Sequence, residues 1–291
     1  MSFGRLITAM VTPFNEQLEI DWEVTGRLVD YLIEEQKSDS LVVSGTTGES
    51  PTLTDDEKEA LFRFTVQRAA GRCKIIAGTG SNDTAHSIHL TRIAEQAGVD
   101  GILLVTPYYN KPNQEGMYRH FKAIAESTSL PVILYNVPGR TGVNLSAATT
   151  LRLAELPNVA ATKECSTLDQ MTEIIKDAPE GFLLYCGDDA VNLPVLSIGG
   201  YGLISVASHV IGAEMKELIA AALEGRREDA VRLNNRCFPV FKGLFQCPHP
   251  VPNPVAVKYA LTLKGLPVGD VRPPLAGPSE EEAAFIRKLL G

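Results

Sequence analysis

A lysine at the end of an apolar run is the residue best suited to chemistry in this sequence. Lys163 closes the run Val159-Ala-Ala-Thr-Lys163, and strand alternation puts it on the same side as Ala161. If that side is buried, desolvation disfavours the ammonium form and lowers the lysine pKa, leaving a neutral amine able to attack a carbonyl. The alternative is a surface lysine paired with Glu164, and spacing alone leaves both readings open.

A second candidate is the glycine-rich loop Gly45-Thr-Thr-Gly-Glu-Ser50, which also follows an apolar run. Its backbone N–H groups could form a nest for an anion such as a substrate carboxylate. The alternative is an ordinary glycine turn with threonine caps. The loop is not a P-loop, because no Lys-Ser/Thr pair follows. Gly78-Thr-Gly80 is not a dinucleotide fingerprint either, because Asp83 takes the place of the third glycine.

Two further runs end in groups that could act on a carboxylate or a carbonyl. Tyr135 ends one run, where its phenol could relay protons, although a buried tyrosine is also an ordinary core residue. Arg140 follows in a Pro-Gly loop, where its planar fork could hold a carboxylate; alone it could equally be a surface charge. Tyr108 and Tyr109 are adjacent, so their side chains diverge, and we expect one to face its own barrel and the other a neighbouring subunit.

Eight apolar, β-branched runs recur along the chain, and segments with helical periodicity follow them. Buried parallel strands have this pattern. The runs cover residues 6–11, 41–43, 74–78, 101–105, 132–136, 159–163, 182–187 and 202–206. We therefore predict an α/β fold of the (β/α)₈ TIM-barrel type, in which residues at the carboxyl ends of the strands form the active site.

Helix signals separate the strands. Thr54 and Glu57 form a capping box that opens a helix over residues 55–70, and Gly71 is a plausible left-handed stop. An apolar stripe over residues 90–97 ends at Gly98. We predict a barrel domain over residues 1–225 and a C-terminal helical region over 226–291, broken by proline-rich stretches at 247–254 and 271–278. The stretch from Cys247 to Pro254 has no functional interpretation.

Composition argues against several classes of protein. The chain has 27 Lys and Arg and 35 Asp and Glu, a net charge of −8 with no basic run, so a nucleic-acid partner is not expected. No signal peptide is expected, because the apolar stretch near the N-terminus covers only residues 6–11 and no small-residue cleavage site follows it. No membrane span is expected either, because prolines and glycines interrupt the longest uncharged stretch, residues 190–213. Five cysteines without a CxxC pair suggest reduced thiols in the cytoplasm. The five histidines include no HExxH pair, so no metal is expected.

Four motifs, taken in order, resemble the pyruvate-dependent aldolase and lyase family that includes dihydrodipicolinate synthase and N-acetylneuraminate lyase. The resemblance extends from about residue 3 to residue 266. The motifs are Gly45-Thr-Thr-Gly-Glu49, Pro107-Tyr-Tyr-Asn110, Tyr135-Asn-Val-Pro-Gly-Arg-Thr-Gly142 and Thr162-Lys-Glu164. Each motif is modest, but four at the right strand ends are highly specific.

The resemblance implies that Lys163 forms a Schiff base with pyruvate. It also implies that the backbone and hydroxyls of Thr46 and Thr47 hold the pyruvate carboxylate, and that Gly187 and Ile204 complete the pocket. No metal or organic cofactor is implied.

Proton transfer is implied for a second group of residues. Tyr135 is the proton donor and acceptor, in a relay with Thr46 and with a Tyr109 that comes from the partner in a tight dimer. Two such dimers usually form a tetramer.

Arg140 decides between the branches of the family. The synthase branch has this arginine in the loop that receives the aldehyde, whereas sialic-acid and sugar-acid lyases generally lack it. We therefore expect condensation of pyruvate with aspartate 4-semialdehyde, in diaminopimelate and lysine biosynthesis. The rivals are a sugar-acid or sialic-acid lyase and a carboxylate sensor without turnover; the presence of both Lys163 and Tyr135 argues against the sensor.

The resemblance also implies an allosteric pocket for lysine. Ser50, Asn82 and Tyr108 match the pattern of lysine-inhibited synthases. Lys58 and His86, however, stand where a histidine or glutamate and another glutamate are expected. Cationic or neutral groups thus replace acceptors for the ammonium of lysine, and we predict weak or absent inhibition by lysine.

Overall fold

The eight predicted strands form a closed barrel in which every strand is parallel to its neighbours. The computed structural model describes residues 2–291. The strands are β1 (Leu6–Ala9), β2 (Ser40–Val43), β3 (Lys74–Gly78), β4 (Gly101–Val105), β5 (Val132–Asn136), β6 (Val159–Glu164), β7 (Leu183–Cys186) and β8 (Gly202–Ser205). They follow one another around the barrel in sequence order, and β8 closes it by pairing with β1.

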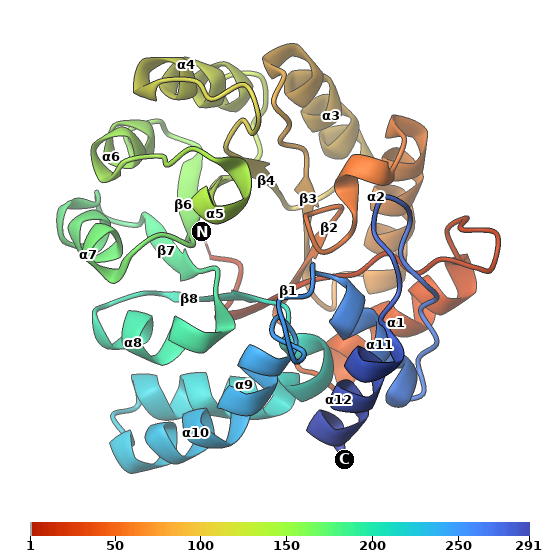
Figure 1. Cartoon of the computed structure of the whole chain (residues 1–291). Coiled ribbons are helices and arrows are strands. Elements are labelled where there is room, and N and C mark those ends of the chain that lie inside the picture. The colour runs from red at the N-terminus through yellow and green to blue at the C-terminus, as the bar shows by residue number, and fades with distance from the viewer. Residues whose placement is uncertain (1) are drawn as a thin grey trace.

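Helices surround the barrel (Figure 1). They are α1 (Trp22–Glu34), α2 (Asp55–Ala69), α3 (Thr84–Ala97), α4 (Gln114–Ala125), α5 (Pro138–Thr141), α6 (Ala147–Ala154), α7 (Leu168–Asp177), α8 (Asn192–Ser197), α9 (Ser208–Leu223), α10 (Arg227–Gly243), α11 (Val255–Leu263) and α12 (Glu280–Leu290). Two short 3₁₀ turns, Ser50–Thr52 and Asp189–Val191, follow β2 and β7. The fold class predicted from the sequence is confirmed.

Some element boundaries differ from the predicted ones. Strand β1 stops at Ala9, before the predicted end at residue 11. The N–H of Met10 still donates to the carbonyl of Val42 in β2, but the N–H of Val11 donates to Nε2 of His209. The capping box of Thr54 is present, but helix α2 ends one residue before its predicted end. The left-handed stop is therefore Ala70 (φ 48°) and not Gly71, which follows it in the same region (φ 76°). Gly98 ends α3 as predicted.

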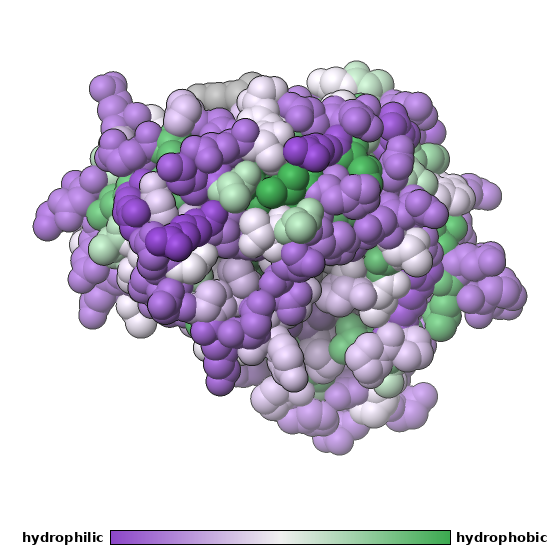
Figure 2. Space-filling model, turned by 90° about the horizontal axis from the view of Figure 1, so that it is seen from above, coloured by the Kyte–Doolittle hydropathy of each residue, from purple (hydrophilic) through white to green (hydrophobic). Residues whose placement is uncertain are grey.

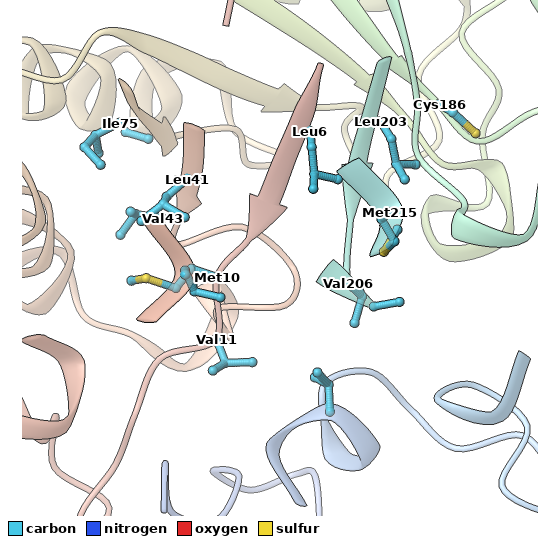
Figure 3. Packing of buried hydrophobic residues seen from close by; sticks show 14 of the residues in the cluster. Leu6, Met10, Val11, Leu41, Val43, Ile75, Cys186, Leu203, Val206 and Met215 are labelled. Atoms are coloured by element: carbon cyan, nitrogen blue, oxygen red, sulfur yellow. The ribbon is translucent and has the colours of Figure 1, made fainter. Parts of the chain in front are cut away.

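Alternating side chains give the barrel two hydrophobic layers. The inner cluster takes one residue or more from every strand: Ile7, Val42, Ile76, Leu103, Ile133, Tyr135, Ala161, Tyr185 and Ile204. The outer cluster lies between the strands and the helices (Figure 3), where Leu6, Leu41 and Leu203 point away from the barrel interior. A polar side chain on the inner side of a strand end is therefore held by a ring of packed apolar residues.

The C-terminal helices complete the outer layer. Helix α10 packs against α9, and α11 packs against both α9 and α12, so the three final helices lie together on one side of the barrel (Figure 1). Val255 and Leu261 of α11 and Ile286 of α12 belong to the same cluster as the barrel residues. The predicted boundary between residues 225 and 226 falls in the turn between α9 and α10.

The surface is mostly hydrophilic on the face seen in Figure 2, where apolar residues occur in small scattered groups. None of the helices in residues 2–291 is long and apolar enough to cross a membrane.

Candidate active site

Lys163 lies inside the barrel, next to Tyr135. The two residues are register partners on the adjacent strands β6 and β5. Only 6% of Lys163 is exposed, and its Nζ lies 4.3 Å from the centre of the Tyr135 ring. No carboxylate among residues 2–291 forms an ion pair with Lys163. The reading of Lys163 as a surface lysine is therefore wrong, and the amine and the phenol are close enough to act on one substrate.

Glu164 points to the opposite side of β6, away from Lys163. Its Oε1 accepts hydrogen bonds from Nδ2 of Asn136 (2.8 Å) and from the N–H of Ser166 (3.0 Å). Burial raises the pKa of Glu164 to about 7, although these hydrogen bonds oppose the shift. Asn136 also accepts from the N–H of Leu145. These contacts join β5 to β6 directly behind Tyr135 and Lys163.

Gly187 leaves room for the lysine side chain. A Cβ atom at this position would lie 3.1 Å from Cε of Lys163 and 2.3 Å from Sγ of Cys165. Any larger residue would therefore displace Lys163 or distort β6. Ile204, on β8, is buried in the inner cluster with Tyr135. The structure thus brings both predicted pocket residues to the interior side of the barrel.

The loop after β2 forms a tight turn with unused donors. Glu49 takes the left-handed conformation (φ 58°), and its N–H donates to the carbonyl of Thr46. The backbone N–H groups of Thr46 and Thr47 donate to no group within residues 2–291. Thr46 is half-buried, and Thr47 is buried with its Oγ1 accepting from Nδ2 of Asn253 at 2.9 Å. Successive free N–H groups in such a turn favour a bound anion.

A buried ion pair fixes this loop to the C-terminal region. Nζ of Lys258 in α11 lies 2.9 Å from Oε1 of Glu49, and the side chains are 2% and 1% exposed. Oε2 of Glu49 accepts from the N–H of Arg272 (2.8 Å), while Nζ of Lys258 also donates to the carbonyl of Asp270 (2.7 Å). Both carboxylate oxygens of Glu49 and two of the three N–H groups of Lys258 have hydrogen-bond partners, and such hydrogen bonding is the condition under which buried charges are tolerated.

A cavity of about 420 Å³ opens beside Tyr135. Thr46 and Arg140 line it together with Tyr135. Arg140, in the short helix α5, is exposed and pairs with no carboxylate within the described chain. Its guanidinium is therefore available to an incoming carboxylate at the edge of the cavity.

All five predicted allosteric residues line this same cavity: Ser50, Lys58, Asn82, His86 and Tyr108. They are accompanied by Asp55, a carboxylate that was not expected there. Asp55 already contacts Nε2 of His86 (2.9 Å) and Nζ of Lys58 (3.7 Å). Burial opposes ionisation of Asp55, but the hydrogen bond from His86 and the nearby positive charges outweigh it and lower its pKa.

Tyr109 is the one predicted catalytic residue that this chain does not bring to the site. It is 88% exposed and left-handed (φ 73°), whereas its neighbour Tyr108 lines the cavity. The two side chains diverge, as expected of adjacent residues, and Tyr108 is the one that faces its own barrel; the expectation that Tyr109 faces a neighbouring subunit stays a prediction.

Sequence reasoning missed three residues around the site. Asn253 contacts Thr47, Lys258 pairs with Glu49, and Oδ2 of Asp189 accepts from the N–H groups of Val206 (3.2 Å) and Ala207 (2.9 Å) just after β8. Burial raises the pKa of Asp189. Two signals were present in the sequence: Asp189 follows the end of a predicted strand, and Asn253 lies in the unexplained proline-rich stretch.

Within residues 2–291 no three His, Cys, Asp or Glu side chains gather in a way that could hold a metal ion.

The fold and the site together define a class: a (β/α)₈ barrel with a buried lysine beside a phenol, the arrangement of aldolases that work through a Schiff base. The model of the dihydrodipicolinate synthetase family matches residues 2–291. This chain belongs to that family.

Individual relatives agree along the whole chain. The chain is 59% identical to the 4-hydroxy-tetrahydrodipicolinate synthase 1 of Halalkalibacterium halodurans, over 97% of this chain and 94% of the relative. The crystal structure of a dihydrodipicolinate synthase from Bacillus anthracis is 49% identical and superposes with a TM-score of 0.96, covering 100% of this chain and 98% of that one. A Cyanidioschyzon merolae enzyme of the same name, crystallised with lysine bound, is 45% identical. It superposes with a TM-score of 0.95 and covers 99% of this chain and 97% of that one.

Proposed function

We propose that this chain is a lyase that condenses pyruvate with aspartate 4-semialdehyde to 4-hydroxy-tetrahydrodipicolinate, in diaminopimelate and lysine biosynthesis. The observation that carries the proposal is the buried Lys163 beside Tyr135, at the carboxyl ends of β6 and β5. Family membership and the names of the relatives support the same reaction.

The first stage joins pyruvate to the enzyme. Nζ of Lys163 attacks C2 of pyruvate, and loss of one water gives a protonated imine. The free N–H groups of the Thr46–Thr47 turn hold the carboxylate. Tyr135 gives and takes the protons of the carbinolamine, since its ring lies against the amine.

The second stage forms the new carbon–carbon bond. The imine withdraws electrons from the methyl group, which loses a proton to give an enamine. The enamine attacks the aldehyde carbon of aspartate 4-semialdehyde, and the resulting alkoxide takes a proton. The amino group of that substrate then attacks the imine carbon, closing the ring and releasing Lys163. The protonated imine accepts the electron pair of the broken C–H bond. These steps therefore require no metal or organic cofactor.

Reduction with borohydride tests the Schiff base directly. In the presence of pyruvate we expect a pyruvyl adduct on the peptide that contains Lys163, and none without pyruvate. Lys58 and Lys258 are also buried and serve as internal controls that should remain unmodified. Lys163→Ala should lose the adduct and nearly all turnover. An unmodified Lys163 in a folded protein would refute the proposal.

The second substrate is tested at Arg140. We propose that its free guanidinium binds the carboxylate of aspartate 4-semialdehyde. Arg140→Ala should raise KM for aspartate 4-semialdehyde by roughly 10- to 100-fold, since a charge-assisted hydrogen bond contributes about 1.5–3 kcal/mol. KM for pyruvate should change little. Unchanged kinetics with aspartate 4-semialdehyde would exclude this role, and sugar-acid substrates would then be assayed.

We propose that the working form is a homotetramer made of two tight dimers, in which Tyr109 reaches the site of the partner and completes a relay with Thr46 and Tyr135. The exposed ring of Tyr109 supports this arrangement. We also infer a cytoplasmic location, because all five cysteines of the described chain are unpaired thiols.

A further inference from the structure

The proline-rich stretch between α10 and α11 has one side chain that reaches the proposed substrate site. Nδ2 of Asn253 lies 2.9 Å from Oγ1 of Thr47, although 206 positions separate the two residues. Asn253 is 8% exposed and Thr47 is 3% exposed, so water does not compete for this contact. Such a buried hydrogen bond fixes the orientation of the Thr47 hydroxyl, next to the free N–H groups of the turn.

The chemistry of the amide and the hydroxyl decides which of them donates the hydrogen bond. An amide nitrogen carries hydrogens and accepts nothing, so Thr47 must be the acceptor. The single proton of the Thr47 hydroxyl then remains for another group, and no acceptor within residues 2–291 takes it. Together with the free N–H groups of Thr46 and Thr47, this proton gives the turn several unused donors. Such a set of donors suits a carboxylate.

Asn253 is itself held firmly in place. The N–H of Val251 donates to the carbonyl of Phe245 (3.0 Å), and the N–H of Val255 to the carbonyl of Pro252 (3.0 Å). One turn further along, Lys258 forms its buried pair with Glu49, which belongs to the same loop as Thr47. The stretch and the loop are thus joined at two buried points, and the amide of Asn253 has little freedom to turn away.

We propose that Asn253 is a positioning residue that holds the Thr47 hydroxyl as a donor toward the carboxylate of pyruvate. The inference rests on the proposed Schiff-base function, because it assumes that pyruvate binds beside Lys163. Asn253 acts through Thr47 and does not touch the reacting atoms. It therefore affects how tightly pyruvate binds and leaves the chemistry after imine formation unchanged.

Two substitutions at Asn253 should have graded effects. Asn253→Ala leaves the Thr47 hydroxyl free to rotate, and KM for pyruvate should rise about fivefold to tenfold, the size expected for one hydrogen bond. Asn253→Asp should raise it further, because a carboxylate accepts the Thr47 proton and also repels the substrate carboxylate. In both variants, kcat and KM for aspartate 4-semialdehyde should stay within about twofold of wild type.

A double-variant cycle separates positioning from a purely structural role. In a Thr47→Val background, which keeps the shape and removes the hydroxyl, Asn253→Ala should cause no further rise in KM for pyruvate. Asn234→Ala in α10 is the matched control and should leave both KM values unchanged. Melting temperatures of all variants show whether an effect comes from lost folding. If Asn253→Asp does not fold, Asn253→Ser, which is too short to reach Thr47, replaces it.

The outcomes are distinct. An unchanged KM for pyruvate in folded Asn253→Ala and Asn253→Asp overturns the inference, as do effects that add fully to that of Thr47→Val. Equal changes in KM for both substrates also overturn it, because they indicate a general disturbance of the barrel. If wild-type protein forms no borohydride-trapped adduct at Lys163, the proposed function fails instead.

Discussion

Lys163 and Glu164 are neighbours in the sequence with opposite surroundings. Lys163 faces the inner cluster and the ring of Tyr135, whereas Glu164 is buried behind the strand, where Asn136 and Ser166 donate to it. One strand end therefore presents an amine to the substrate on one side and anchors β5 to β6 on the other. The anchor holds Tyr135 and Lys163 at a constant separation.

The raised pKa of Glu164 predicts that the stability of the folded protein depends on pH. The folded protein keeps the proton of Glu164 up to a pKa of about 7, and the unfolded chain releases it near the ordinary value of 4.5. The folded state binds more protons in this window, so the contribution of Glu164 to stability falls as pH rises from 4.5 to 7. By pH 7 this group has lowered the free energy of unfolding by about 3 kcal/mol relative to its value below pH 4.5.

Glu164→Gln removes this titration and keeps an oxygen for Asn136 and Ser166. Its advantage in free energy of unfolding over wild type should grow from pH 4.5 to 7 and then level off. Urea unfolding of both proteins at one fixed concentration measures the difference. Other titrating groups, such as the buried His120 and His209, cancel in this comparison. A difference that does not vary with pH would show that Glu164 is ionised throughout.

Lys58 and His86 lead to a prediction about lysine. Their shared partner Asp55 is already occupied, so the ammonium group of a lysine ligand would find a positive charge and no free carboxylate. Activity should therefore persist at lysine concentrations in the millimolar range. Lys58→Glu should strengthen inhibition about tenfold or more, because it replaces repulsion by attraction. Inhibition of the wild type at sub-millimolar lysine would contradict this prediction.

At the scale of elements, the loop after β2 depends on a helix that lies far away in the sequence. Glu49 belongs to the loop and Lys258 to α11, and the ion pair between them is almost completely buried. Lys258 and the guanidinium of Arg272 also lie over the ring of Phe14. The C-terminal helices thus support the substrate loop as well as the outer core.

Breaking this pair should destabilise the protein strongly. Lys258→Met leaves the Glu49 carboxylate buried without a partner, at a cost of about 3–5 kcal/mol in the free energy of unfolding. The double variant Lys258→Met/Glu49→Gln removes both charges and should recover most of that loss. Thermal and urea unfolding at equal protein concentration compare the three proteins. Losses that simply add in the double variant would mean that the two charges are not coupled.

At the scale of the whole molecule, a single chain lacks one group of the proposed relay. Tyr109 extends into solvent, next to a residue that lines the cavity. If the partner supplies this ring, the active site exists only in the assembled dimer. Dilution below the dimer dissociation constant should then abolish activity while the barrel stays folded.

Mixing two impaired variants tests this arrangement. Lys163→Ala lacks the amine, and Tyr109→Phe lacks the phenol that the partner would receive. In a mixed dimer, one site regains both groups, so random exchange of subunits should restore about one quarter of wild-type activity. Mixing without exchange of subunits is the control. No recovery after proven exchange would mean that each chain uses its own Tyr109.

Much of the barrel could be predicted because its signals are local. Apolar runs at regular intervals, a capping box at Thr54 and a glycine stop at Gly98 each depend on neighbouring residues only. For the same reason, strand ends pointed to Lys163, Tyr135 and the Thr46–Thr47 turn as candidates. Hydrophobic periodicity and strand direction are properties of short segments, and they place such residues at one end of a barrel.

Contacts between distant segments were decided only by the tertiary structure. Nothing near Asn253 in the sequence indicates Thr47 as its partner, and nothing near Lys258 indicates Glu49. The burial of Glu164 and the exposure of Tyr109 arise in the same way. So does the cavity that both Tyr135 and the predicted allosteric residues line. They depend on how separate elements pack, and packing is set by the whole chain at once, whereas the sequence pattern of one element carries information about that element alone.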